Sequence, residues 1–130
     1  MPQISQGTIA NPVIVATGGV PFVGTATSAN SPSTITVPAV AGKTFYLTHF
    51  SISGSGATAA SCTNVSTTNL LVDAYFIFSV PAGVNNAVEL KRDFTYPVPA
   101  KAVNTPVTFF MPAFGAGNTL QCFYVVGYYA

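Results

Sequence analysis

The sequence predicts an all-β protein, an antiparallel β-sandwich of the jelly-roll type with about eight strands. Three observations support this fold class. Apolar residues along the 130-residue chain recur with a period of two rather than the helical period of about 3.6. Ten prolines and eleven glycines divide the chain into strand-length segments. These segments are joined by short turns, which is the pattern of a sandwich or a small barrel.

The first part of the chain, residues 1–32, is expected to form an extended N-terminal arm or edge strands, followed by a sandwich domain at 33–130. This region is rich in Thr, Ala, Ser, Gly and Asn, and its two short extended pieces are separated by a glycine pair. Its extended pieces are strand-like and apolar but have few anchors of their own, so we expect the region to contact a neighbouring chain. The residues expected to make that contact are Val13, Ile14, Val15, Phe22 and Val23.

From residue 33 onward the strand pattern is clearer. Turns rich in Gly, Pro and Asn, such as Gly54–Ala57 and Pro81–Asn86, favour reversals of the chain because these residues fix φ or tolerate a positive one. The strands expected between the turns lie at 34–37, 44–53, 59–65, 70–80, 87–94, 106–111 and 119–128.

Two of these strands, 70–80 and 119–128, carry apolar residues on both faces, which indicates burial on both faces. No helix is expected to cover the second face, so the cover is either another subunit or the arm folded back. We expect the apolar residues that face away from the core to form an interface with another chain. These residues are Tyr75, Ile77, Phe110, Phe123, Val125 and Tyr129.

Charged residues make up only 5% of the chain, against about 25% of an average soluble domain. Four scattered cations attract few phosphates, so nucleic acid is not an expected partner. A membrane is not expected either, since no apolar run approaches the ~20 residues of a spanning helix. So few charges favour a surface that is largely covered by other protein chains. The alternative is an exposed surface rich in Ser, Thr and Asn.

No catalytic, cofactor-binding or metal-binding residues are expected. The only histidine, His49, lies in a strand. Pairing with Asp73 across strands is the one arrangement open to it for catalysis, and a structural hydrogen bond is the favoured role of a single strand histidine. The Gly-x-Ser-x-Gly motif of a nucleophile is absent, and the His, Cys and acidic residues lack metal-ligand spacing. Cys62 and Cys122 are expected to be buried free thiols, although a disulfide between them stays open.

The charged cluster at residues 89–93 is expected to mark a solvated edge strand, where charges block the addition of foreign strands.

Glycan binding stays open as a different class of function. Tyrosine rings can act as stacking platforms for sugars, although they serve equally well at protein interfaces, and the chain has no tryptophan. The tyrosines available for stacking are Tyr46, Tyr75, Tyr96, Tyr124, Tyr128 and Tyr129.

Three segments in the last two-thirds of the chain resemble small structural proteins of tailed bacteriophages. They are Ala-Gly-Lys-Thr-Phe-Tyr-Leu-Thr at 41–48, the segment 93–100 ending in Tyr-Pro-Val-Pro-Ala, and the C-terminal stretch from Gly115-Ala-Gly-Asn-Thr to Gly127-Tyr128. The proteins that the chain resembles are head decoration or cement proteins with a jelly-roll fold. This resemblance implies a homotrimer seated where major capsid subunits meet, which stabilises the shell against internal DNA pressure.

The function expected from this resemblance is that of a non-enzymatic virion subunit, made in the host cytoplasm and located on the capsid surface. Its partners are copies of itself and the major capsid protein or other virion proteins. A tail or fibre component that contacts the host is the alternative within the structural class.

Overall fold

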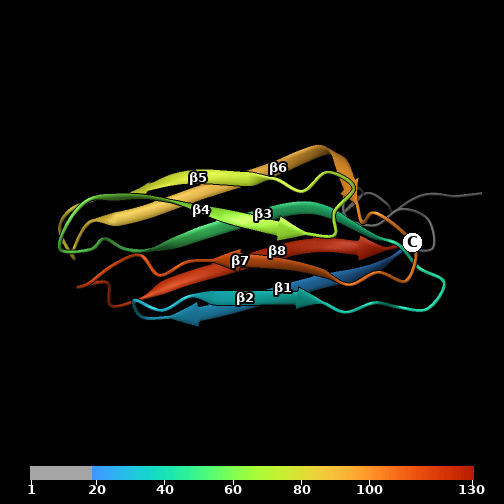
Figure 1. Ribbon diagram of the computed structural model, residues 1–130, viewed down its shortest axis with the longest axis horizontal. Helices are drawn as coiled ribbons and strands as arrows, with labels where there is room; N and C mark the ends of the chain where they lie inside the picture. Colours follow the sequence, from blue (N-terminus) through green and yellow to red (C-terminus); the bar gives the residue numbers. More distant parts are fainter. Residues whose placement is uncertain (1–18) are drawn as a thin grey trace, which may run out of the picture.

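The structure, a computed structural model that describes residues 19–130, confirms the all-β fold class. Its described part contains eight strands and no helix. The strands form two four-stranded antiparallel sheets, β1-β8-β3-β6, here called sheet I, and β2-β7-β4-β5, here called sheet II. The two sheets lie one over the other in Figure 1. The strands are β1 (Val20–Ser28), β2 (Ser33–Val37), β3 (Phe45–Ser55), β4 (Ser61–Thr68), β5 (Tyr75–Val80), β6 (Ala87–Pro99), β7 (Val107–Met111) and β8 (Gln121–Tyr129).

The pairing of the strands identifies the jelly roll. β1 pairs with β8, β2 with β7, β3 with β6 and β4 with β5. Each of these pairs joins one of the first four strands along the chain to one of the last four. A chain folded into one long hairpin and then rolled into two sheets produces this arrangement. The predicted antiparallel β-sandwich of about eight strands is therefore confirmed.

The strand expected at 70–80 is shorter than predicted, because β5 begins only at Tyr75. Residues 69–74 instead form a turn around the carboxylate of Asp73. This carboxylate accepts the backbone N–H of Asn69 at 3.2 Å and that of Leu70 at 2.9 Å, while Asn69 takes a positive φ of 72°. Asn tolerates this left-handed conformation better than most residues, so it suits the turn.

The core lies between the sheets, and Phe50 is near its centre. The ring of Phe50 contacts those of Phe76 in sheet II and of Phe94 and Phe123 in sheet I, with centroid distances of 4.7, 6.2 and 6.4 Å. Each buried aromatic side chain contributes about 1.5–3 kcal/mol relative to exposure. The largest fully buried apolar side chains are Phe45, Phe50, Phe109, Phe114, Phe123, Leu47, Ile52 and Met111.

The face of β8 expected at an interface is the one turned toward the core. Phe123, Val125 and Tyr129 are buried in the subunit, whereas Tyr124 on the alternate face is 39% exposed. The assignment of Phe123, Val125 and Tyr129 to an interface is therefore wrong. Alternation placed them together on one face correctly, but both faces of β8 are apolar and alternation alone does not say which is inside.

The region expected as an arm contributes β1, an edge strand of sheet I that pairs with β8 along its whole length. The ring of Phe22 packs edge-on against Phe45 at 5.8 Å and Tyr129 at 6.2 Å. Phe22 thus belongs to the core side of its own subunit, and the expected inter-chain contact is wrong for this residue. Val23 points outward and is exposed. The other expected contacts, Val13, Ile14 and Val15, lie outside the described residues.

The orientation of β8 can be tested by truncating adjacent side chains. Phe123→Ala leaves a cavity between the sheets and is expected to lower the free energy of unfolding by about 3–5 kcal/mol. Tyr124→Ala, one residue further along the strand, removes a partly solvated ring and is expected to cost only about 1 kcal/mol. Urea unfolding of both variants measures the difference. Equal losses, or a larger loss for Tyr124→Ala, would contradict the orientation.

The buried phenol of Tyr129 is expected to make the free energy of unfolding depend on pH. Its hydroxyl donates to the carbonyl of Pro38 at 2.7 Å, and burial raises the pKa of the phenol above its ordinary value. The folded state therefore holds the phenolic proton more tightly than the unfolded state. This contribution to stability is fully present below about pH 10, the ordinary tyrosine pKa, and is lost as the pH rises through the raised folded-state pKa.

Tyr129→Phe removes this titration. The variant is expected to be about 1 kcal/mol less stable at neutral pH, because it loses the hydrogen bond to Pro38. Above about pH 10 its stability falls less steeply than that of the wild type. Urea midpoints measured from neutral to alkaline pH check both expectations, and parallel curves for the two proteins would show that Tyr129 does not titrate as argued.

Candidate functional site

The charged side chains are distributed unequally between the two sheets. Glu89, Lys91, Arg92 and Asp93 all lie on β6, the edge strand of sheet I, and the other charged residues lie in loops. Within β6, Lys91 and Glu89 form an exposed ion pair at 3.4 Å, a type of contact that adds at most about 1 kcal/mol. The expectation that residues 89–93 mark an edge strand is confirmed. No strand of sheet II carries a charged residue.

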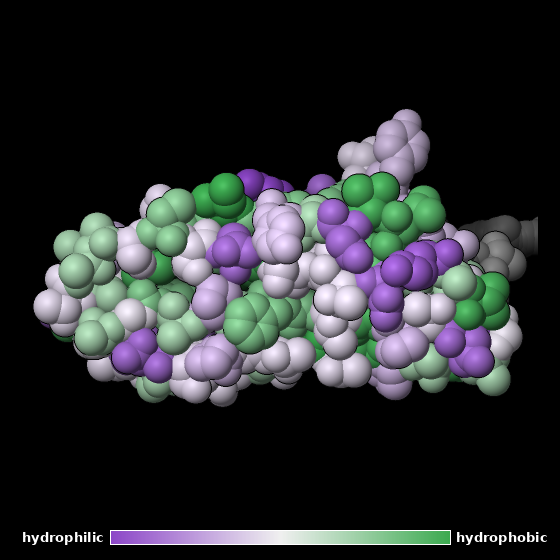
Figure 2. Space-filling view, viewed as in Figure 1, coloured by the Kyte–Doolittle hydropathy of each residue, from purple (hydrophilic) through white to green (hydrophobic). Residues whose placement is uncertain are grey.

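The outer face of sheet II gathers three of the residues predicted for an interface. Tyr75, Ile77 and Phe110 are 76%, 66% and 42% exposed. In the strand register Ser66 lies opposite both Phe110 and Tyr75, so the two rings flank one serine across three adjacent strands. Whether another chain covers these residues stays a prediction. Figure 2, which looks onto this side of the sandwich, shows pale and green residues over most of the middle of the face.

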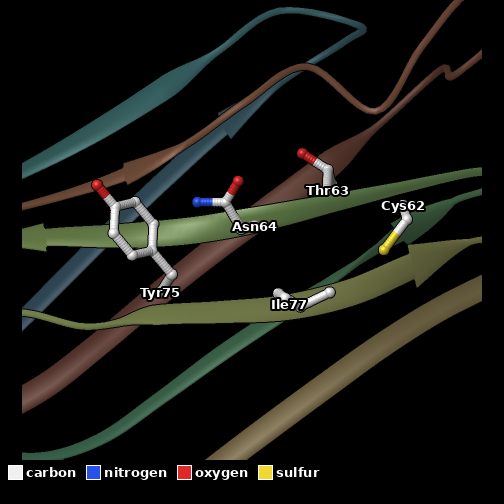
Figure 3. A pocket seen from close by; sticks show the side chains of 5 residues that line it. All are labelled: Cys62, Thr63, Asn64, Tyr75 and Ile77. Carbon is white, nitrogen blue, oxygen red and sulfur yellow. The ribbon is translucent and has the colours of Figure 1, made fainter.

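A shallow hollow of about 430 Å³ lies on this face between β4 and β5. Figure 3 shows Tyr75 and Ile77 on β5, with Cys62 and Asn64 on the neighbouring strand β4. Asn64 is directly opposite Ile77 in the register, so an amide group lies beside an exposed aliphatic side chain. Together with Thr63, these residues give the hollow an uncharged lining.

The two cysteines are unpaired and lie on opposite outer faces of the sandwich. Cys62 pairs in register with Ser79 on sheet II, whereas Cys122 pairs with Thr27 on sheet I. This separation excludes a disulfide between them within one subunit. The expectation of buried thiols is wrong for Cys62, which is exposed, while Cys122 is half-buried.

The outer face of sheet I holds the only histidine of the chain in a second, larger hollow of about 700 Å³. His49 Nδ1 lies 2.7 Å from Asp93 Oδ1, and the His49 ring meets that of Tyr124 edge-on at 6.1 Å. The pairing of His49 with Asp73 considered from the sequence is wrong, since Asp73 holds the turn before β5. The register places Asp93 directly opposite His49 instead.

Within residues 19–130, no three His, Cys, Asp or Glu side chains come together as a group that could hold a metal ion. The same part of the chain contains no helix with the length and hydrophobicity needed to cross a membrane.

Comparisons of the chain with protein-family models, with curated proteins and with solved structures found no match. The function is therefore inferred from the surfaces of the sandwich and from the resemblance of its segments.

Proposed function

We propose that this protein is a non-enzymatic structural subunit of a virion, a decoration or cement protein on the capsid surface of a phage head. It is made in the host cytoplasm, assembles as a homotrimer and binds the major capsid protein. The observation that carries the proposal is the outer face of sheet II, which has no charged side chain and exposes Tyr75, Ile77 and Phe110.

This face has the composition of a contact surface. Burying an aliphatic or aromatic side chain contributes about 1.5–3 kcal/mol. Most of this stabilisation is still unrealised for Tyr75 and Ile77, and a smaller part for Phe110. Between them lie mainly hydroxyl side chains from Ser and Thr, whose desolvation costs far less than that of a charge. Tyrosine suits such a surface because its ring is buried while its hydroxyl reaches the wet rim.

The occupant of this face is a second copy of the same chain. Two copies of an uncharged face meet without like-charge repulsion, which would otherwise cost several kcal/mol. The charged strand β6 belongs to sheet I, so it remains solvated when the outer face of sheet II is covered. The trimeric state follows from the resemblance to decoration proteins and not from the geometry of the face.

The choice of a phage head rests on the three segments that resemble decoration proteins. In the fold these segments contribute to β3, β6 and β8, which are three neighbouring strands of sheet I. The resemblance therefore extends over one continuous part of the sandwich, on the side opposite the proposed contact face.

Electron microscopy of the particle that contains this protein tests the function. We expect density at regular lattice positions on the head and a high copy number per particle. Density confined to the tail would overturn the assignment to the capsid and would leave a tail or fibre component as the function.

The contact face predicts the effect of two substitutions on the oligomer. Ile77→Asp and Phe110→Asp each place a charge in the face, and burying that charge without a partner costs several kcal/mol. We expect light scattering to show smaller species for both variants at concentrations where the wild type is oligomeric. Tyr96→Asp is the control, since Tyr96 is 86% exposed on β6 of sheet I, away from the proposed contact face.

Retention of the oligomer in both sheet II variants would overturn the assignment of the face, as would dissociation by Tyr96→Asp alone. A wild-type chain that is monomeric at high micromolar concentration would overturn the oligomer itself.

The two natural cysteines report which face is covered. In the oligomer, alkylation of Cys62 is expected to be at least about tenfold slower than in the dissociated Ile77→Asp variant, equivalent to about 1.4 kcal/mol of protection. Cys122 lies on the other face and is expected to react at the same rate in both proteins. Mass spectrometry of the two peptides after timed alkylation gives both rates. Protection of Cys122 with Cys62 unchanged would place the contact on sheet I.

A further inference from the structure

The hollow on the outer face of sheet I is produced by a break in the pairing of β3 and β6. Leu47 lies opposite Val98 and His49 opposite Asp93. Between these two pairs β3 has only Thr48, whereas β6 has residues 94–97. The longer segment of β6 must bow away from β3, and this opens the sheet above His49. Irregular pairing of this kind is enriched beside binding and active sites.

One side of the hollow is apolar. Tyr124 and Val126 of β8 and Pro97 of β6 provide a ring and two aliphatic surfaces. Tyr124 is partly exposed, and its ring is positioned by the edge-on contact with His49. Thr48 donates its hydroxyl hydrogen to the Val126 carbonyl at 3.0 Å, which fixes the bulge against β8. The apolar surface is thus supported by its neighbours.

The other side of the hollow offers hydrogen-bonding atoms. A carboxylate only accepts, so the Nδ1–H of His49 donates to Asp93 Oδ1, and His49 Nε2 is left as an acceptor when the ring is neutral. The second oxygen of Asp93 makes no hydrogen bond within residues 19–130, and the Asp93 side chain is 83% exposed. Thr95, which carries a hydroxyl, also lines the hollow. The site combines several acceptors with a hydroxyl that both donates and accepts.

We propose that this hollow binds a neutral saccharide. A pyranose ring presents an apolar C–H surface, which stacks on Tyr124, and an edge of hydroxyls, which donate to Asp93 and to His49 Nε2. The Asp93 carboxylate disfavours an anionic ligand such as a phosphate. A quaternary amine is disfavoured because the hollow does not have the several rings that form an aromatic cage. The volume of about 700 Å³ lies within the range of about 300–1,000 Å³ that small-ligand sites occupy.

This binding site goes beyond the proposed structural function and does not depend on it. The hollow lies on sheet I, opposite the face proposed to contact other copies. Contact between copies through sheet II therefore leaves the hollow accessible to a saccharide.

The test uses the full chain and three neutral probes, maltotriose, cellotriose and triacetylchitotriose, at millimolar concentrations. Nuclear magnetic resonance titration is expected to shift the amide signals of Tyr124, His49 and Asp93 for at least one probe. Tyr124→Ala and Asp93→Asn are each expected to weaken that binding at least about tenfold. Tyr124→Phe keeps the ring and is expected to lose less affinity than Tyr124→Ala.

Tyr96→Ala is the matched control. Tyr96 is 86% exposed on the same strand as Asp93 but does not line the hollow, so the control is expected to bind as well as the wild type. The dispersed spectrum of each variant establishes that it is folded.

Absence of any shift with all three probes would overturn the proposal. So would binding that survives both Tyr124→Ala and Asp93→Asn, or binding that Tyr96→Ala abolishes. The oligomeric state is measured separately, so loss of sugar binding and failure of the structural function are distinguishable outcomes.

Discussion

The aromatic contacts of Phe50 determine which side chains this protein presents to its surroundings. Phe76, Phe94 and Phe123 are all drawn inward to the ring of Phe50. Because side chains alternate along a strand, each of these inward residues forces its neighbours outward. The neighbours include Tyr75 and Ile77 on sheet II and Asp93 and Tyr124 on sheet I. Both outer faces are therefore consequences of one packing arrangement in the core.

The two outer faces differ chemically although one core produces both. Sheet I has the charged strand β6 and a hollow opened by irregular pairing, whereas sheet II has regular pairing and no charge. An uncharged sheet face costs little free energy to desolvate, which suits a large contact with protein. A concave region with convergent polar groups suits a small ligand. This difference is the physical basis for assigning separate roles to the two faces.

Much of the fold was predictable from the sequence because strand alternation and turn residues are local signals. Alternation correctly placed Tyr75 and Ile77 on the same face of their strand, away from the core. The opposite face carries Phe76 and Phe78, whereas the face of Tyr75 and Ile77 also carries an Asp and a Ser, so the more apolar face is the one expected inside. The same signal failed for β8, where both faces are apolar and the register with the neighbouring strands, which places Phe123 beside the buried Ile52, decides which face is inside. The partner of His49 was missed because it depends on the register with β6, which single-strand patterns do not contain.

The jelly-roll pairing also has a consequence for how the chain acquires its structure. β1 and β3 both pair with β8, the last of the eight described strands along the chain, so sheet I cannot form until β8 has been synthesised. Pairings this distant along the chain must first overcome loop-closure entropy, which places folding in the range of milliseconds to seconds rather than microseconds. Until then β1 and β3, which carry no charged residue, lack their pairing with β8 and are prone to associate with other nascent chains. The sandwich is thus most vulnerable to aggregation during translation, and its rate of synthesis and local concentration influence how much of it folds.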